Sequence, residues 1–392
     1  MARPPYRVSD RARDIPPFQV MDILARACAL EAAGRRIVHM EIGEPDFTTP
    51  APVVEAGVRA LRAGYTHYTT ALGLPALRES ISAFYRRRYG IAVAPERIVI
   101  TPGASGALQL ALALLLNPGD QVLLSDPGYP CNRQLVRLAG GEPVGLPVDA
   151  TSAFQPTAEQ VHGAWSPRTV ALLLASPANP TGTLIAPGAL KAIWDKVEAC
   201  NGALIVDEIY HGLVYGEEAP SALALSEHVL VVNSFSKYFG MTGWRLGWLV
   251  APSETVPYLD RLAQNLFLAA PTPAQHAALA AFEPETIAIL EGRRREFQRR
   301  RDYLLTSLRA LGFGIPVVPG GAFYIYADCR RFGQGGELAR ALLEQAGVAV
   351  TPGSDFGRHH ASEHLRFAYT TSMEQLEEGV ARLRAYLEGT VR

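Results

Sequence analysis

Six short apolar runs between about residues 97 and 251 constrain the fold of this 392-residue chain more than any other feature. Turn residues bound each run, and helix-like segments separate several of them. Such runs are typical of strands buried on both faces, and helices between them produce a largely parallel sheet. The runs are RIVIT (97–101), QVLLSD (121–126), TVALLLA (169–175), ALIVDE (203–208), VLVVNS (229–234) and LGWLVA (246–251).

The pattern changes after about residue 284. A long charged helix is predicted over roughly 284–311, and two strand-like segments, GGAFYIYAD and HLRFAYT, each precede an amphipathic helix. This order is typical of an α+β unit. We therefore predict an α/β chain with two domains. The large one, over 49–284, contains a mostly parallel sheet flanked by helices, and a smaller discontinuous α+β domain combines 1–48 with 285–392.

Composition and charge argue against several classes of partner. The formal net charge is −1, which gives no reason to expect nucleic acid or an anionic membrane. No apolar run approaches the ~18 residues of a membrane span, and no secretion signal is evident. His359, His360 and His364 lack partner ligands, the four cysteines are far apart, and the arginine run over 293–301 is interpreted as a solvated helix face. We expect a cytoplasmic protein without a metal, nucleic-acid or membrane partner.

Polar residues gather where the predicted strands end. Ligands of open parallel sheets bind at the carboxyl ends of the strands, so residues there converge on one edge. VLVVN leads to Ser234, Ser236 and Lys237, with Arg245 shortly after. The other runs lead to Gly103, Ala104, Ser105, Tyr129, Asn179, Asp207 and Tyr210. This convergence argues against an ordinary surface position for Lys237.

Part of this set predicts a phosphate site. A helix is expected to begin at Gly103, and the free N–H groups of its first turn attract anions. Ser234, Ser236 and Arg245 would add two hydroxyl groups and a fixed cation. A plain strand-to-helix turn is the alternative if the first turn is considered alone.

The rest of the set predicts an aldehyde cofactor with a ring nitrogen. Asp207 follows an apolar strand, and a buried carboxylate usually has a positive partner, which a protonated pyridine nitrogen would supply. Tyr129 can stack on a flat ring. Lys237 can form a Schiff base with an aldehyde, so the whole set fits pyridoxal 5′-phosphate.

Seven motifs carry a family resemblance: YTHYTTALGLPALRES, TPGASGALQL, DPGYP, SPANPTG, VDEIY, SFSKYFGMTGWRLGW and LRFAYT. In this order and spacing the chain resembles the class I aminotransferases of the fold-type I pyridoxal-phosphate-dependent enzymes, from IGEPDF (42–47) to LRFAYT (365–370). The resemblance implies a homodimeric transferase of amino-acid metabolism. Such an enzyme moves an amino group between an L-amino acid and a 2-oxo acid by a ping-pong mechanism.

The resemblance also implies how the cofactor is held. Lys237 would bind it covalently and move the proton, Asp207 would keep the ring nitrogen protonated, and Tyr129 would stack on the ring. Ala104, Ser105, Ser234, Ser236 and Arg245 would hold the phosphate.

Further residues are implied around the substrate and the cofactor oxygen. Tyr210 and Asn179 would hydrogen-bond the 3-oxygen of the cofactor. Arg366 would bind the substrate α-carboxylate, assisted by Asn179 and the Gly43 backbone. Tyr68 would reach the phosphate of the neighbouring subunit, so the two active sites would be shared.

The chain departs from part of the family at Ser105. Some bacterial aspartate aminotransferases of this subgroup have a lysine in the matching turn for the distal substrate carboxylate. We therefore expect neutral amino-acid donors. Two other functions stay open: a pyridoxal-phosphate-dependent C–S lyase on the same fold, and a pyridoxal-phosphate-binding transcription regulator. The regulator is disfavoured because no DNA-binding module and no basic excess are evident.

Overall fold

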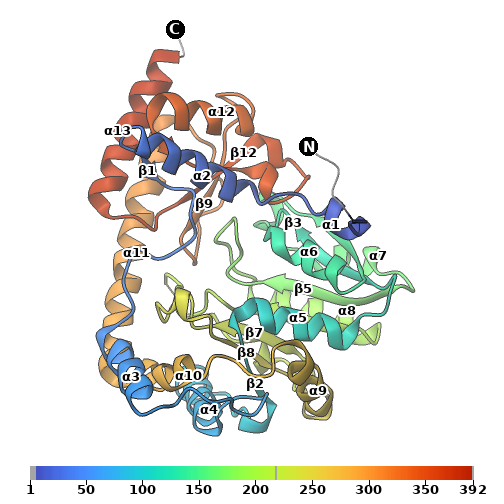
Figure 1. Ribbon diagram of the computed structural model, residues 1–392. Helices are drawn as coiled ribbons and strands as arrows, with labels where there is room; N and C mark the ends of the chain where they lie inside the picture. Colours follow the sequence, from blue (N-terminus) through green and yellow to red (C-terminus); the bar gives the residue numbers. More distant parts are fainter. Residues whose placement is uncertain (1–5, 217–218, 391–392) are drawn as a thin grey trace.

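A computed structural model describes residues 6–216 and 219–390 of the protein. Its centre is a seven-stranded sheet with the order β2 (Ile98–Thr101), β8 (Gly247–Val250), β7 (Leu230–Ser234), β6 (Ala203–Asp207), β5 (Thr169–Ala175), β3 (Gln121–Asp126) and β4 (Glu142–Pro147) (Figure 1). Neighbouring strands are parallel except at β8, which is antiparallel to both β2 and β7. The predicted mostly parallel sheet is confirmed.

Alternate side chains of the central strands pack on opposite faces of this sheet. Leu172 and Leu204 belong to one hydrophobic cluster, and Leu173 and Ile205 belong to another. Both faces of the central strands are therefore buried, which explains why their sequences are continuously apolar. One face packs against α5 (Gly103–Leu115), α6 (Pro130–Leu138) and α9 (Val256–Leu266). The other packs against α4 (Pro75–Tyr89), α7 (Ala158–Ala164), α8 (Pro187–Ala199) and α10 (Thr272–Leu279).

A second group of short strands lies at the other end of the molecule. β11 (Thr351–Pro352), β12 (His364–Ala368) and β9 (Tyr324–Asp328) form an antiparallel sheet, and β1 (Val38–His39) pairs in parallel with β10 (Val348–Ala349). Around them lie α2 (Gln19–Ala32), α12 (Gly335–Ala341) and α13 (Met373–Thr390), while α1 (Asp10–Asp14) precedes α2 (Figure 1).

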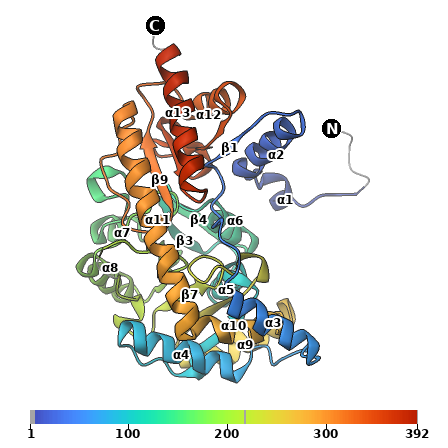
Figure 2. The same cartoon turned by 90° about the vertical axis from the view of Figure 1, so that its left-hand side faces the viewer.

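The long helix α11 (Pro284–Leu311) connects the two ends of the molecule (Figure 2). It begins near α3 (Ala51–Arg62) and α10, runs alongside the central sheet, and packs against α13 at its far end. Gly312 ends it with φ of 100°, a left-handed conformation that glycine adopts without steric cost. The helix predicted over 284–311 is confirmed.

Two features of the sheet and one of the helix differ from expectation. The strand β4 was not predicted because EPVGLP contains two prolines, which restrict a strand to the sheet edge where β4 lies. The antiparallel direction of β8 cannot be read from an apolar run. The arginine run is not uniformly solvated: Arg300 is 4% exposed and pairs with Asp46 at 2.8 Å, because α11 passes the 42–47 segment there.

The outer limits of the predicted small domain, residues 1–5 and 391–392, lie outside the described part of the chain, as do residues 217–218. Within the described ranges, no helix combines the length and apolar character needed to span a membrane.

Candidate functional site

Most of the predicted site residues converge at one edge of the central sheet. The strands β5, β6 and β7 are neighbours and parallel, and they end at Ala175, Asp207 and Ser234. Because β8 is antiparallel to both β7 and β2, the end of β2 and the start of α5 face the same edge. The sheet therefore brings together residues that are more than one hundred positions apart in the sequence.

An anion cradle lies at the start of α5. No side chain caps this helix, so the N–H groups of its first turn are available to a ligand. Gly103 has φ of 71°, and a Cβ atom there would lie only 2.6 Å from Nη2 of Arg245. The Arg245 guanidinium thus lies directly against the helix start. The hydroxyls of Ser234 and Ser236 are 3.0 Å apart and buried. Amide, hydroxyl and guanidinium donors of this kind fit a phosphate group.

The amine of Lys237 lies above this edge. Its Nζ atom donates a hydrogen bond to the backbone carbonyl of Gly43 at 2.8 Å and lies 5.8 Å from the centroid of the Phe323 ring. Burial lowers the pKa of Lys237 to about 8, since the protonated amine loses hydration. A substantial fraction of the amine is therefore unprotonated slightly above neutral pH, as a nucleophile requires.

The carboxylate of Asp207 is buried, with 5% of the residue exposed. Its Oδ1 atom accepts a hydrogen bond from the backbone N–H of Ile209 at 3.0 Å. Burial nevertheless raises the pKa of Asp207 to about 6. Among the described residues, no lysine, arginine or histidine forms an ion pair with it. A buried carboxylate in this state fits a cationic ligand group such as a protonated ring nitrogen.

The guanidinium of Arg366 is also buried, and the residue is 2% exposed. Its Nη1 atom donates to Oδ1 of Asn179 at 3.0 Å, and Nη2 donates to the backbone carbonyl of Glu41 and to Oγ1 of Thr351 at 3.2 Å. All these acceptors are neutral. Within the described part of the chain no carboxylate pairs with Arg366, and its Nε atom has no hydrogen-bond partner. The predicted proximity of Asn179 and Arg366 is present.

Tyr324 is a residue of this region that the sequence reasoning missed. Its hydroxyl lies 2.9 Å from the hydroxyl of Tyr210, and its ring centroid lies 4.4 Å from Cζ of Arg366. A Cβ atom on Gly43 would lie within 1.9 Å of the same hydroxyl, so only glycine fits there. The one available signal was the alternation of Tyr324 and Tyr326 in FYIYA, which places both side chains on the same face of a strand.

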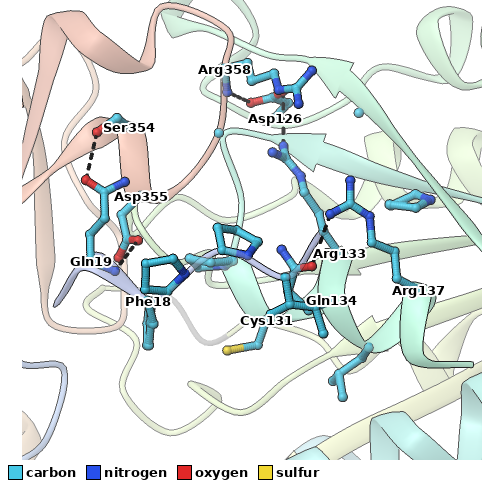
Figure 3. A pocket seen from close by; sticks show the side chains of 18 of the residues that line it. Phe18, Gln19, Asp126, Cys131, Arg133, Gln134, Arg137, Ser354, Asp355 and Arg358 are labelled. Atoms are coloured by element: carbon cyan, nitrogen blue, oxygen red, sulfur yellow. Dashed lines mark hydrogen bonds and ion pairs between the residues drawn. The ribbon is translucent and has the colours of Figure 1, made fainter. Parts of the chain in front are cut away.

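A cavity of about 650 Å³ is bordered by Phe18, Cys131 and Asp355 (Figure 3). Ser105 lines the cavity, and Tyr129 contacts the cavity residue Phe18 edge to face with 6.4 Å between ring centroids. The cavity-lining residues other than Ser105 come from the segment that leads into α2, from β3 and β4, from α6 and from the loop after β11. They include Cys131, Arg133, Arg137, Asp355 and Arg358.

The charges of this cavity are partly paired. Nη2 of Arg133 lies 3.1 Å from Oδ2 of Asp126, and the other oxygen of Asp126 accepts the backbone N–H of Arg358 at 2.8 Å. The carboxylate of Asp355 accepts the backbone N–H of Gln19 at 2.9 Å (Figure 3). The carboxylates of Asp126 and Asp355 therefore connect different segments of the cavity wall. Ser105 contributes a neutral hydroxyl to the lining.

Tyr68 is not brought to the other site residues. Its residue surface is 81% exposed, and it borders a separate surface hollow with Tyr65 and His276. Among the residues that the structure describes, no three histidine, cysteine, aspartate or glutamate side chains lie close enough together to hold a metal ion.

The chain is similar to known proteins over nearly its whole length. The pattern of the family described as aminotransferase class I and II matches residues 35–383. The chain is 38% identical to (5-formylfuran-3-yl)methyl phosphate transaminase of Methanocaldococcus jannaschii, over 97% of this chain and 99% of that protein. It is 39% identical to valine–pyruvate aminotransferase of Mycobacterium tuberculosis, over 97% and 98% of the two chains. The structure of aspartate aminotransferase from Thermus thermophilus with maleate superposes with a TM-score of 0.92 at 37% identity, over 97% of this chain and 99% of that one.

Proposed function

The chain belongs to the class I and II aminotransferases, and from this premise we propose which of its residues carry out amino transfer and which donors it accepts. As a member, it is a pyridoxal-phosphate-dependent enzyme that moves an amino group between an amino acid and a 2-oxo acid. The family resemblance of its motifs is confirmed.

The observation that carries the site assignment is the uncompensated buried charge of Arg366. A buried guanidinium with only neutral acceptors and a free Nε–H is costly unless an anion joins it. The α-carboxylate is the anion that every amino acid and every 2-oxo acid shares. Arg366 therefore binds this carboxylate, and Asn179 holds the guanidinium in orientation.

The residues at the site fit each group of the cofactor. The start of α5 at Gly103, Ala104 and Ser105 would take the phosphate together with Ser234, Ser236 and Arg245. Asp207 would keep a proton on the ring nitrogen, Tyr129 would stack on the ring, and Asn179 and Tyr210 would donate to the 3-oxygen. When bound, the cofactor supplies an electron-withdrawing ring that accepts the electron pair left when the substrate loses its α-proton.

Lys237 moves that proton. Its amine, whose pKa burial lowers to about 8, would take the proton from the substrate α-carbon and hold it for return. Over the full cycle, one amino acid would be converted to its 2-oxo acid with uptake of one water, and the loaded enzyme would retain the amino group. A second 2-oxo acid would take up that amino group, release the water and leave as an amino acid. The Gly43 carbonyl orients the Lys237 amine between these transfers.

Neutral amino acids are proposed as donors. Ser105 lines the cavity with a neutral hydroxyl, and Asp126 pairs with Arg133. The valine–pyruvate aminotransferase among the relatives supports this proposal, while other relatives are named aspartate aminotransferases.

Assembly, domain division and location are also part of the proposal. Tyr68 is 81% exposed in the single chain, so it is free to contact a second subunit. This exposure supports a homodimer in which Tyr68 reaches the partner's phosphate site. The strands of the central sheet all fall between 98 and 250, and all other strands lie outside 49–284, which supports the two-domain division at those limits. Four free cysteines support a reducing, cytoplasmic location.

A half-reaction tests the function. Purified enzyme carrying pyridoxal phosphate is mixed with single amino acids without any 2-oxo acid, and the absorption spectrum is followed. An amino donor should replace the visible absorption of the aldehyde form with the near-ultraviolet absorption of the amine form, and one 2-oxo acid should form per site. If all twenty amino acids leave the spectrum unchanged, or if they yield ammonia and pyruvate, the proposal fails.

A further inference from the structure

We propose that Tyr324 is a positioning residue that couples the arginine at the substrate carboxylate to the tyrosine at the cofactor oxygen. This inference rests on the proposed function, because it assigns Arg366 and Tyr210 to these two groups. Tyr324 is 1% exposed and contacts both residues, one through its ring and the other through its hydroxyl.

The ring of Tyr324 fixes the Arg366 guanidinium from one side. Cζ of Arg366 lies 4.4 Å from the Tyr324 centroid and 4.7 Å from the centroid of Phe356. A cation held between two aromatic rings is attracted by both faces and cannot tilt freely. The two rings thereby set the plane in which the guanidinium meets a carboxylate.

The hydroxyl of Tyr324 fixes Tyr210. The two oxygens are 2.9 Å apart, and the rings are nearly perpendicular, at 85°. Tyr210 can donate its own proton to the cofactor oxygen only if Tyr324 is the donor between the two hydroxyls. Gly43 packs closely against the same hydroxyl, since a Cβ atom at position 43 would lie 1.9 Å from it.

This arrangement gives the hydroxyl and the ring separate effects. A donated hydrogen bond from Tyr324 polarises the Tyr210 hydroxyl and strengthens its bond to a negatively charged cofactor oxygen. Losing it should favour the protonated form of the bound cofactor and raise the pH midpoint of its visible absorption change. Losing the ring should instead weaken carboxylate binding at Arg366.

Two variants of Tyr324 separate these effects, and Tyr326→Phe is the matched control. The Tyr326 hydroxyl lies on the same face of β9 and is buried, but it has no hydrogen-bond partner among the described residues. Tyr324→Phe should raise the pH midpoint of the absorption change by roughly half a pH unit, with KM for the best donor nearly unchanged. Tyr324→Leu should raise the midpoint equally and also raise KM about 10-fold or more. Tyr326→Phe should titrate like wild type.

A double-variant cycle distinguishes coupling from general disturbance of the site. If Tyr324 acts through Tyr210, then Tyr324→Phe should add nothing to the midpoint of a Tyr210→Phe enzyme. The inference is overturned if Tyr324→Phe titrates like wild type, if Tyr326→Phe moves the midpoint as far, or if the two changes add in full. A wild-type enzyme without a visible absorption band would instead contradict the proposed function.

Discussion

The amine of Lys237 donates a hydrogen bond at 2.8 Å to the carbonyl of Gly43, which lies 194 residues earlier in the chain. The 42–47 segment is thus placed over the carboxyl edge of the central sheet. A side chain at position 43 would meet the hydroxyl of Tyr324, so this close approach requires glycine. The amine is held in place while its pKa stays low.

This placement predicts that Lys237 is the residue that carries the cofactor. Borohydride reduction of the holoenzyme should fix the cofactor to the peptide that contains Lys237, as mass spectrometry would detect. Lys237→Ala should fold, bind the cofactor without a covalent bond and lose nearly all turnover. Lys191, which is exposed and paired with Asp195, is the control lysine. Labelling of Lys191 or of Lys196 in place of Lys237 would refute the assignment.

Replacing Arg366 should weaken every substrate alike. Arg366→Lys keeps the charge but loses the planar fork that binds a carboxylate with two hydrogen bonds. We expect kcat/KM to fall about 10-fold or more for every donor, since a charged hydrogen bond contributes about 1.5–3 kcal/mol. Arg330→Lys is the control, because the Arg330 side chain is 67% exposed. A fall confined to one donor would show that Arg366 reads the side chain instead.

Asp207 should destabilise the cofactor-free protein above pH 6. Its folded pKa of about 6 lies above the ~3.9 of an unfolded chain, so the stability that its protonated form provides is complete below about pH 4 and is lost as the pH rises through about 6. Asp207→Asn keeps the Ile209 hydrogen bond without the charge. At pH 8 the cofactor-free variant should be more stable than wild type, by on the order of 2 kcal/mol.

The same substitution should have the opposite effect once cofactor is bound. The holoenzyme loses the partner of the ring nitrogen, so turnover should fall steeply. Urea unfolding at pH 4 and pH 8, with and without cofactor, measures both effects. Equal stability of wild-type and variant cofactor-free protein at pH 8 would show that the carboxylate is hydrated or paired in solution.

Donor preference should reflect the neutral hydroxyl of Ser105 in the cavity lining. Aliphatic, aromatic or sulfur-containing amino acids should give higher kcat/KM than aspartate, with 2-oxoglutarate or pyruvate as acceptor. Ser105→Lys should then improve aspartate relative to the best neutral donor, because it adds a cation at the cavity wall. If aspartate is the best donor of the wild-type enzyme, the cavity arginines must supply the cation.

Mixed dimers test whether Tyr68 crosses the subunit interface. Lys237→Ala and Tyr68→Ala chains are unfolded and refolded together. If Tyr68 serves the partner's site, each heterodimer has one doubly damaged site and one intact site, so activity should return. If Tyr68 serves its own chain, both sites stay damaged. The test requires that the Tyr68→Ala homodimer loses most activity, and given that control, a mixture no more active than its parents rejects the shared site.

Much of the site could be predicted because strand ends are visible in the sequence. Asp207 and Ser234 end apolar runs that had to be buried strands, and parallel neighbours place their carboxyl ends together. The alternation in FYIYA was too weak a signal to identify Tyr324, since an aromatic residue within an apolar strand is interpreted as a core residue until its neighbours are known. Arg300 was misread for a related reason: its burial depends on Asp46, and the sequence does not show that α11 passes the 42–47 segment.

Arg245 adopts a left-handed backbone conformation, with φ of 53° and ψ of 55°. A non-glycine residue in this conformation costs roughly 1–2 kcal/mol, which glycine would avoid. Selection for heat resistance alone would therefore favour Arg245→Gly, and the same change would remove the guanidinium beside the first turn of α5. A directed-evolution experiment on this enzyme should therefore keep arginine at position 245. Screening for thermal stability alone would otherwise select variants that retain the cofactor poorly.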